Sequence, residues 1–267
     1  MRCVVDGQEL EYEERGEGRP IVFIHGLTTD HRLLLGACDA VFDRPGLRRI
    51  YLSLPGHGGS TANLVGAHAD ALVAAVRGAL RALGAADAPV VAHSYGAYLT
   101  LGVLRDLPSL AGLFLICPVV QPDLGWRNLP PQRYAVIEDG LTFEDDVERN
   151  AFDAEVSVYT RETLARFRRD VMPGHRVADR FFVERVRARY SQSPPLWHTL
   201  RAYRGLVHIL CGHDDYWAGY EDAAHLARAF VSCDLHVLPG CGHFLPVEKP
   251  AALATALTAW LEGLPAS

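Results

Sequence analysis

Short apolar runs recur along the chain and alternate with longer stretches of helical periodicity. The short runs are apolar on both faces, which is typical of strands buried in a parallel sheet. They predict strands at 21–24, 49–52, 89–92, 113–116, 206–210 and 235–238. Helical patterns lie between most of them, for example at 67–83, 97–107, 221–230 and 249–261. This alternation predicts an α/β fold with a doubly wound, mostly parallel sheet.

The first residues of the chain follow a separate pattern. Asp6-Gly7 lies between two short runs within residues 3–12. The Asp-Gly pair favours a tight turn between two antiparallel strands. We therefore expect a β-hairpin ahead of the parallel sheet.

The alternation of strands and helices stops after Pro118 and resumes near Leu206. The intervening stretch is rich in charged and aromatic residues, and amphipathic helices are predicted at 143–156, 161–171 and 176–190. It is inserted at the carboxyl end of a strand, where open α/β sheets bind ligands. We predict that residues 119–203 form a helical lid over a pocket. The core would then consist of residues 1–118 and 204–267.

The composition narrows the class of protein. With 267 residues and 49% hydrophobic content, the chain can build one large core, or one core with a subsidiary lobe. Its formal net charge is -6 and no basic run stands apart, which argues against binding to nucleic acid. The expected partner is a small-molecule substrate, bound by a monomer or a homodimer.

Two further observations concern location and cofactors. The N-terminus turns polar before an apolar signal segment can form, and no later apolar run is long enough to span a bilayer, so we expect a cytoplasmic enzyme without a membrane partner. The six cysteines show neither a C-x-x-C pair nor a metal-like spacing with histidine, and are interpreted as buried thiols. No cofactor and no metal are expected.

Ser94 stands where a predicted strand ends and a predicted helix begins. A nucleophile elbow needs this context, because a sharp, strained turn lifts the serine hydroxyl above the sheet. Small residues two positions before and after it let the strand and the helix approach each other; Gly96 is one, and Ala92 replaces the usual glycine at the other. A serine here could also be an ordinary helix N-cap. The surrounding pattern favours a nucleophile.

The strand at 21–24 runs into His25-Gly26-Leu27. In such a turn the backbone N–H of Leu27, together with that of Tyr95 directly after Ser94, is predicted to form an oxyanion hole, worth ~3 kcal/mol per donor at the transition state. His25, His31 and Arg32 are candidate substrate contacts. The ordinary alternatives are a hydrogen bond that braces the turn for His25, and helix capping or a salt bridge for the other two.

Two loops at strand ends carry the remaining candidates. Asp214 and Asp215 follow the strand at 206–210, and His243 follows the last predicted strand within a glycine-rich loop. The chemistry requires His243 to accept the proton of Ser94, while an aspartate fixes its tautomer and stabilises the imidazolium. Because all three residue types lie at ends of core strands, coincidence is a poor explanation.

These motifs resemble those of the α/β-hydrolase family over essentially the whole chain. The matching stations are Ile24-His25-Gly26, Leu54-Pro55-Gly56-His57-Gly58-Gly59-Ser60, His93-Ser94-Tyr95-Gly96, Gly212-His213-Asp214-Asp215 and Gly242-His243-Phe244. The family's acid usually stands three residues after the glycine, which implies Asp215 rather than Asp214. Asp123 occupies a position that some relatives use and is a second candidate. Ser53 stands where such sequences often have Asp, outside the triad.

The resemblance and the residues together imply acyl transfer by a Ser94–His243–Asp215 triad. A carboxylic ester is the first choice of substrate, with thioesters, lactones and carbon–carbon bonds beside a ketone as competitors. A serine nucleophile disfavours epoxide hydrolase and dehalogenase chemistry, which uses a carboxylate in this fold. A non-hydrolytic cyclisation or lyase step and ligand binding without turnover stay open as alternatives. The arginines of the predicted lid would hold an anionic substrate if they point inward.

Overall fold

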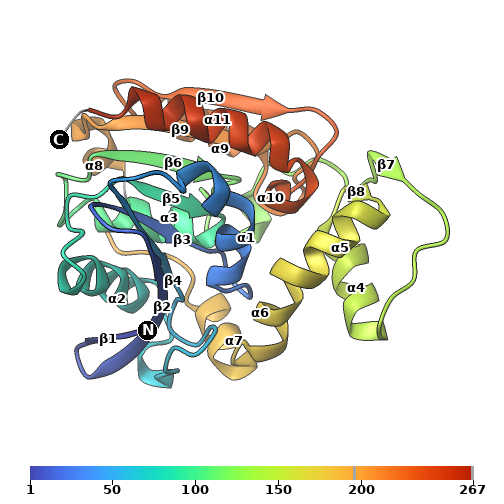
Figure 1. Ribbon diagram of the computed structural model, residues 1–267, viewed down its shortest axis with the longest axis horizontal. Coiled ribbons are helices and arrows are strands. Elements are labelled where there is room, and N and C mark those ends of the chain that lie inside the picture. Colours follow the sequence, from blue (N-terminus) through green and yellow to red (C-terminus); the bar gives the residue numbers. More distant parts are fainter. Residues whose placement is uncertain (195–196, 266–267) are drawn as a thin grey trace.

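The computed structural model describes residues 1–194 and 197–265. Its central sheet has eight strands in the order β1-β2-β4-β3-β5-β6-β9-β10 (Figure 1). The bounds are β1 Arg2–Val5, β2 Gln8–Arg15, β3 Arg19–Ile24, β4 Leu47–Leu52, β5 Val90–His93, β6 Gly112–Ile116, β9 Leu206–Gly212 and β10 Asp234–Leu238. All pairs from β4 to β10 along this order are parallel. The predicted α/β fold with a mostly parallel sheet is confirmed.

Helices cover both faces of this sheet. The helices α2 (Ala69–Ala82), α3 (Tyr95–Val103) and α9 (Tyr220–Ala227) contribute to one apolar core, and α1 (His31–Phe42), α10 (Leu245–Glu248) and α11 (Pro250–Gly263) contribute to the other. Successive residues of β3 alternate between the two: Val22 and Ile24 belong to the first core, Ile21 and Phe23 to the second. This double burial explains why the strands are apolar on both faces.

The N-terminal strands form the predicted hairpin. β1 and β2 pair in antiparallel register, and Asp6 and Gly7 take φ values of +49° and +78° at the turn. Two successive positive φ angles characterise a type I′ turn, which aspartate and glycine tolerate best. β2 also pairs antiparallel with β4, so the hairpin extends the parallel sheet at one edge.

Between β6 and β9 the chain forms a mostly helical insertion. Its elements are the 3-10 turn η2 Leu124–Trp126, β7 Val136–Ile137, α4 Asp146–Glu155, β8 Val158–Tyr159, α5 Arg161–Asp170, α6 Met172–Val177, α7 Arg180–Ala188 and α8 Trp197–Ala202. Figure 1 shows α4, α5 and α6 side by side, outside the sheet. The helices predicted at 143–156 and 161–171 correspond to α4 and α5.

The helix predicted at 176–190 is wrong as a single element. α6 ends at Val177, and α7 begins at Arg180 after a break. Asp179 causes the break, because its carboxylate accepts the backbone N–H of Phe182 at 2.9 Å and so caps a new helix. Within the described part of the chain, no helix is long and apolar enough to cross a membrane.

Candidate active site

Ser94 lies in the tight turn between β5 and α3, with a φ of +53°. It occupies the N-cap position of α3, yet its side chain caps no backbone N–H of the helix. The turn depends on Gly96, since a Cβ there would lie 2.2 Å from the carbonyl oxygen of His25. The hydroxyl of Ser94 is thus left free of helix capping and turned toward another partner.

That partner is His243, in the loop after β10. Its Nε2 lies 2.8 Å from the Oγ of Ser94, and its Nδ1 lies 3.0 and 2.9 Å from the two carboxylate oxygens of Asp215. All three side chains are buried. The structure therefore brings together the serine, the histidine and the aspartate that the sequence singled out, in an unbroken hydrogen-bonded series.

Asp215 is the last residue of this hydrogen-bonded series, and its surroundings favour the ionised carboxylate. Its Oδ1 also accepts the backbone N–H groups of Trp217 and Ala218, each at 2.9 Å. Burial alone would raise the pKa of Asp215, but the adjacent imidazole and these two N–H groups outweigh it and hold the pKa below its ordinary value. An ionised Asp215 can orient His243 through Nδ1.

The two competing acids point elsewhere. Asp214 is buried, but its carboxylate pairs with Arg133 of the insertion at 2.6 Å. Asp123 is exposed and caps the η2 turn by accepting the N–H of Gly125 at 2.9 Å. Neither carboxylate makes a hydrogen bond to His243 among the contacts of the described residues.

A buried carboxyl group supports the histidine loop from behind. The Oε2 of Glu248, at the end of α10, accepts the backbone N–H of Gly242 at 2.8 Å. Burial raises the pKa of Glu248 to about 7. The ring of His93 also contacts this loop through the carbonyl oxygen of His243 at 3.0 Å, and burial lowers its pKa to about 3, so it is neutral at physiological pH.

The two predicted oxyanion donors belong to residues close to Ser94. Tyr95 is the first residue of α3, where backbone N–H groups have no partner within the helix. The turn carrying Leu27 is close, because a Cβ on Gly26 would lie 2.9 Å from the Cβ of Ser94. In the described residues, neither N–H donates to a protein acceptor. Both are available to a developing oxyanion.

The three predicted substrate contacts do not line the cavity beside Ser94. His25 is fully buried, and its Nε2 accepts the backbone N–H of Leu54 at 2.9 Å. His31 contacts the hydroxyl of Ser53 at 2.8 Å, and Arg32 pairs with Asp30 at 3.3 Å. Because none of the three lines the cavity, their contacts fit the ordinary alternatives, namely bracing of the turn for His25 and a hydrogen bond or salt bridge near the start of α1 for His31 and Arg32.

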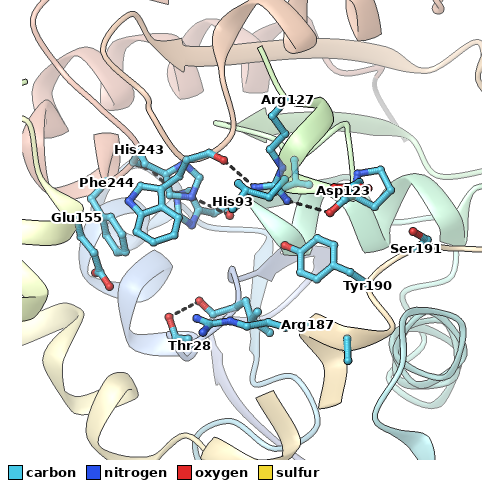
Figure 2. Close-up of a pocket in the computed structure, with 17 residues that line it drawn as sticks. Thr28, His93, Asp123, Arg127, Glu155, Arg187, Tyr190, Ser191, His243 and Phe244 are labelled. Atoms are coloured by element: carbon cyan, nitrogen blue, oxygen red, sulfur yellow. Dashed lines mark hydrogen bonds between the residues drawn. The ribbon is translucent and has the colours of Figure 1, made fainter. Parts of the chain in front are cut away.

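The cavity has a volume of about 540 Å³ and opens beside Ser94 and His243 (Figure 2). Core residues supply part of the wall and the insertion supplies the rest. The insertion's charged and aromatic contributions are Asp123, Arg127, Glu155, Arg187 and Tyr190. In Figure 2 the Arg187 side chain reaches from α7 toward Thr28.

Sequence reasoning missed three of these wall residues: Arg127, Glu155 and Tyr190. Tyr190 packs against the ring of Tyr95 in a tilted arrangement with centroids 4.1 Å apart, and the guanidinium of Arg127 lies 5.6 Å from the Tyr190 ring centre. Glu155 ends α4, whose amphipathic pattern was the signal that one face turns inward. Arg127 follows the short turn η2, where no periodicity indicates its direction. Tyr190 was included in the helix predicted at 176–190, but α7 ends at Ala188, so the helical pattern does not give the direction of its side chain.

One group of potential metal ligands occurs at the site. An Sγ atom of Cys117, a carboxylate oxygen of Asp215 and a ring nitrogen of His243 lie within 4.8 Å of one another. Burial raises the pKa of the Cys117 thiol well above its ordinary value, and the thiol donates to the carbonyl oxygen of Gly242 at 3.7 Å. A protonated thiol is a poor metal ligand, so this group fits the triad better than a metal centre.

Comparison with known proteins identifies the family of the chain. A model of the alpha/beta hydrolase family matches residues 21–256. The 2-hydroxy-6-oxononadienedioate/2-hydroxy-6-oxononatrienedioate hydrolase of Burkholderia vietnamiensis is 26% identical, over 93% of this chain and 90% of that protein. The 2-succinyl-6-hydroxy-2,4-cyclohexadiene-1-carboxylate synthase of Salmonella heidelberg is 28% identical, over 89% and 91%. The crystal structure of an alpha/beta superfamily hydrolase from Oenococcus oeni superposes with a TM-score of 0.90 at 23% identity, covering 98% of both chains. The chain belongs to the alpha/beta hydrolase family.

Proposed function

We propose that the protein is a serine hydrolase that cleaves a carboxylic ester or a related acyl compound through an acyl-enzyme. The observation that carries this proposal is the unbroken contact from the Oγ of Ser94 through His243 to Asp215. A serine hydroxyl is a weak nucleophile, and it is activated when a neutral imidazole accepts its proton as the new bond forms. The proposal is also supported by the position of Ser94, which is buried, has a positive φ and lines the cavity.

The reaction takes place in two halves. In the first, the Oγ of Ser94 attacks the substrate carbonyl carbon, its proton passes to the Nε2 of His243, and the N–H groups of Leu27 and Tyr95 bind the oxyanion. His243 then protonates the departing alkoxide. In the second half, His243 takes a proton from water, which attacks the acyl-enzyme, and then returns that proton to the Oγ of Ser94 as the acid leaves. Asp215 holds the imidazole and stabilises its charged form throughout.

Residues 119–203 serve as a lid in this proposal. Support comes from the insertion side chains that line the cavity and from the packing of the Tyr190 ring against Tyr95, which joins the insertion to the residue after the nucleophile. A cover of this kind limits the access of water and sets the shape of the acyl and alcohol groups that fit.

We also propose that the substrate carries an acidic group, bound at Arg127 and Arg187. Arg127 lines the cavity, and three main-chain carbonyl oxygens hold its guanidinium; among the described residues it has no carboxylate partner. Within the part of the chain that the structure describes, the ion-pair partner of Arg187 is Glu184, on its own helix. Arginine suits carboxylate recognition because its donors match two oxygens at once. The names of the Burkholderia and Salmonella relatives specify carboxylated molecules, which supports the same class.

A non-hydrolytic reaction is the second candidate, because the Salmonella relative is named a synthase. The mass of the product distinguishes the two: hydrolysis adds one water to the substrate, whereas elimination or cyclisation does not. A product series without added water, formed by Ser94-dependent turnover, would favour this candidate.

The nucleophile is tested by labelling with a serine-reactive phosphonate. We expect one covalent adduct per native chain, located on Ser94 by peptide mass analysis, and none in Ser94→Ala. Ser109→Ala is the matched control, since Ser109 is an exposed serine outside the cavity, and it should label like the native protein. Equal labelling of native protein and Ser94→Ala would overturn the proposal.

A further inference from the structure

His175 of α6 lies between the oxyanion turn and the cavity wall. Its Nδ1 is 3.0 Å from the carbonyl oxygen of Thr28, and its Nε2 is 2.8 Å from the Oε2 of Glu155. A carbonyl oxygen and an ionised carboxylate both accept hydrogen bonds. A neutral imidazole has one N–H and can serve only one of them, whereas an imidazolium serves both.

We propose that His175, as an imidazolium bound to Glu155, is a positioning residue that holds the oxyanion turn in its catalytic conformation. This inference rests on the proposed function, because the turn matters to catalysis only if Leu27 donates to an oxyanion. His175 itself contacts no reacting atom in this arrangement. It acts on the peptide unit that follows the oxyanion donor.

The turn needs support of this kind. Thr28 adopts a φ of +71°, which is strained for a residue branched at Cβ. Its backbone N–H donates to the Nε2 of His57 at 3.1 Å, and its carbonyl oxygen accepts from His175. One histidine from the core and one from the insertion therefore hold opposite ends of the same strained residue, directly after Leu27.

The main chain of α6 fixes where His175 can reach. A Cβ on Gly174 would lie 2.7 Å from the backbone nitrogen of Asp30 and 2.9 Å from the carbonyl carbon of Thr29. Only glycine allows this approach, so the helix rests directly on the turn. Movement of the insertion away from the core would withdraw the imidazole of His175 from Thr28. The turn that carries the N–H of Leu27 would lose this support at the same time.

The surroundings favour the charged ring over a neutral one. His175 faces Glu155 from α4, Asp30 after the oxyanion turn and His57 from the loop after β4, and the apolar rings of Phe167 and Phe244 close the remaining sides. Burial lowers the pKa of His175, but Glu155, the carbonyl of Thr28 and Asp30 outweigh it, so the pKa is raised above its ordinary value. The ring keeps both protons at pH values where a free histidine would lose one.

A distinctive pH dependence follows. A catalytic histidine that must be neutral limits activity on the acid side only. Loss of the second proton from His175 adds a limit on the alkaline side, because one of its two acceptors then loses its donor. We expect kcat for a neutral aryl ester to fall as pH rises through the raised pKa of His175.

Two variants separate positioning from simple structural support. His175→Gln removes the cation, and we expect kcat to fall about 10- to 100-fold at neutral pH and to approach the native value on the alkaline side. Glu155→Gln supplies an N–H donor to a neutral ring, whose Nδ1–H still serves Thr28. This variant should therefore lose the alkaline fall in kcat. If the His175–Glu155 pair only stabilised the fold, Glu155→Gln would break the pair. The variant would then lose activity instead of losing the alkaline fall in kcat.

His208→Gln is the matched control. His208 pairs with Asp234 at 3.1 Å between β9 and β10, away from the cavity, so its loss should leave the pH profile of kcat unchanged. An NMR titration of the His175 ring gives a readout independent of activity, and the ring should stay cationic above the ordinary histidine range in native protein but not in Glu155→Gln. Persistence of the alkaline fall in Glu155→Gln, or a neutral His175 ring at neutral pH, would overturn the proposal. Absence of Ser94-dependent hydrolysis would instead count against the proposed function.

Discussion

The Nε2 of His243 lies 2.8 Å from the Oγ of Ser94, although 149 residues separate the two along the chain. Two acidic residues fix the loop of His243, one through the ring and one through the backbone. Asp215 holds Nδ1, and Glu248 accepts the N–H of Gly242 just before the histidine. The contact is within the hydrogen-bond reach that general-base catalysis needs, so the proposed activation of Ser94 would require no rearrangement of these side chains.

The first prediction concerns the acid. Asp215→Asn should lower kcat for an aryl ester by about 10⁴-fold, because an amide at this position favours the wrong tautomer of His243. Asp214→Asn should change kcat far less, since the Asp214 carboxylate binds Arg133 and not the imidazole. Steady-state kinetics on the two variants and on Asp123→Asn provides the comparison. A larger loss in either control than in Asp215→Asn would move the acid to that residue.

The second prediction concerns the elbow. Gly96→Ala should separate β3 from α3, because the new Cβ would lie 2.2 Å from the carbonyl oxygen of His25. We expect the free energy of unfolding to fall by about 1–3 kcal/mol and the rate of phosphonate labelling at Ser94 to fall with it. Urea unfolding and labelling kinetics measure the two effects.

Gly66→Ala is the control for that change. The nearest atom to its new Cβ would be the Cβ of Ala71 at 3.7 Å, an ordinary contact, and the φ of Gly66 is not positive. This variant should unfold and label like native protein. Similar losses in both variants would show that the elbow has no special need for glycine.

The contrast between the core and the insertion explains what the sequence could predict. A buried strand such as Ile21–Ile24 is apolar on both faces whatever its neighbours are. The strands of the sheet can therefore be predicted from the local pattern of apolar residues. Ser94, Asp215 and His243 follow strands, and parallel strands bring their carboxyl ends to one edge. Their convergence could therefore be inferred without knowledge of side-chain contacts.

The pattern in the insertion predicted helices such as α4 and α5, but it did not indicate which residues of the core their side chains contact. The side chain of His175 contacts the carbonyl oxygen of Thr28, which is 147 residues away in the sequence. Tyr190 packs against the ring of Tyr95, which is also far away in the sequence. Such pairings depend on how helices rest on the core, which periodicity does not specify. For the same reason His25 was open to a substrate role in the sequence, whereas the structure encloses it completely.

The third prediction concerns the stability of the histidine loop. Burial raises the pKa of Glu248 from 4.5 to about 7, so the folded state binds a proton that the unfolded state releases between these values. The free energy of unfolding should therefore fall as pH rises through this window, by up to about 3 kcal/mol. Glu248→Gln keeps an oxygen for the N–H of Gly242 and carries no charge, so it should remove that fall.

Urea unfolding at a series of pH values, from acid to mildly alkaline, measures this effect. Glu262→Gln is the control, because Glu262 is exposed at the end of α11. It should leave the pH dependence of stability as in native protein. A Glu248→Gln variant that is less stable than native protein on the alkaline side would show that Glu248 is needed as a carboxylate.

The fourth prediction concerns substrate charge. If Arg187 binds an acidic group of the substrate, Arg187→Gln should lower kcat/KM for an ester with a free carboxylate by about 10- to 100-fold, the range of a hydrogen bond to a charged group. The same variant should hydrolyse a neutral ester of equal size nearly as well as native protein, because Arg187 takes no part in the attack by Ser94. Arg185→Gln is the matched control, since Arg185 is exposed on the same helix and does not line the cavity.

The quantity that tests this prediction is the ratio of kcat/KM for the acidic ester to kcat/KM for the neutral ester. A ratio that is the same in native protein, Arg187→Gln and Arg127→Gln would contradict recognition of an anionic substrate at this wall. A ratio that changes only in Arg127→Gln would assign the contact to Arg127, whose guanidinium already lies fixed by main-chain carbonyl oxygens.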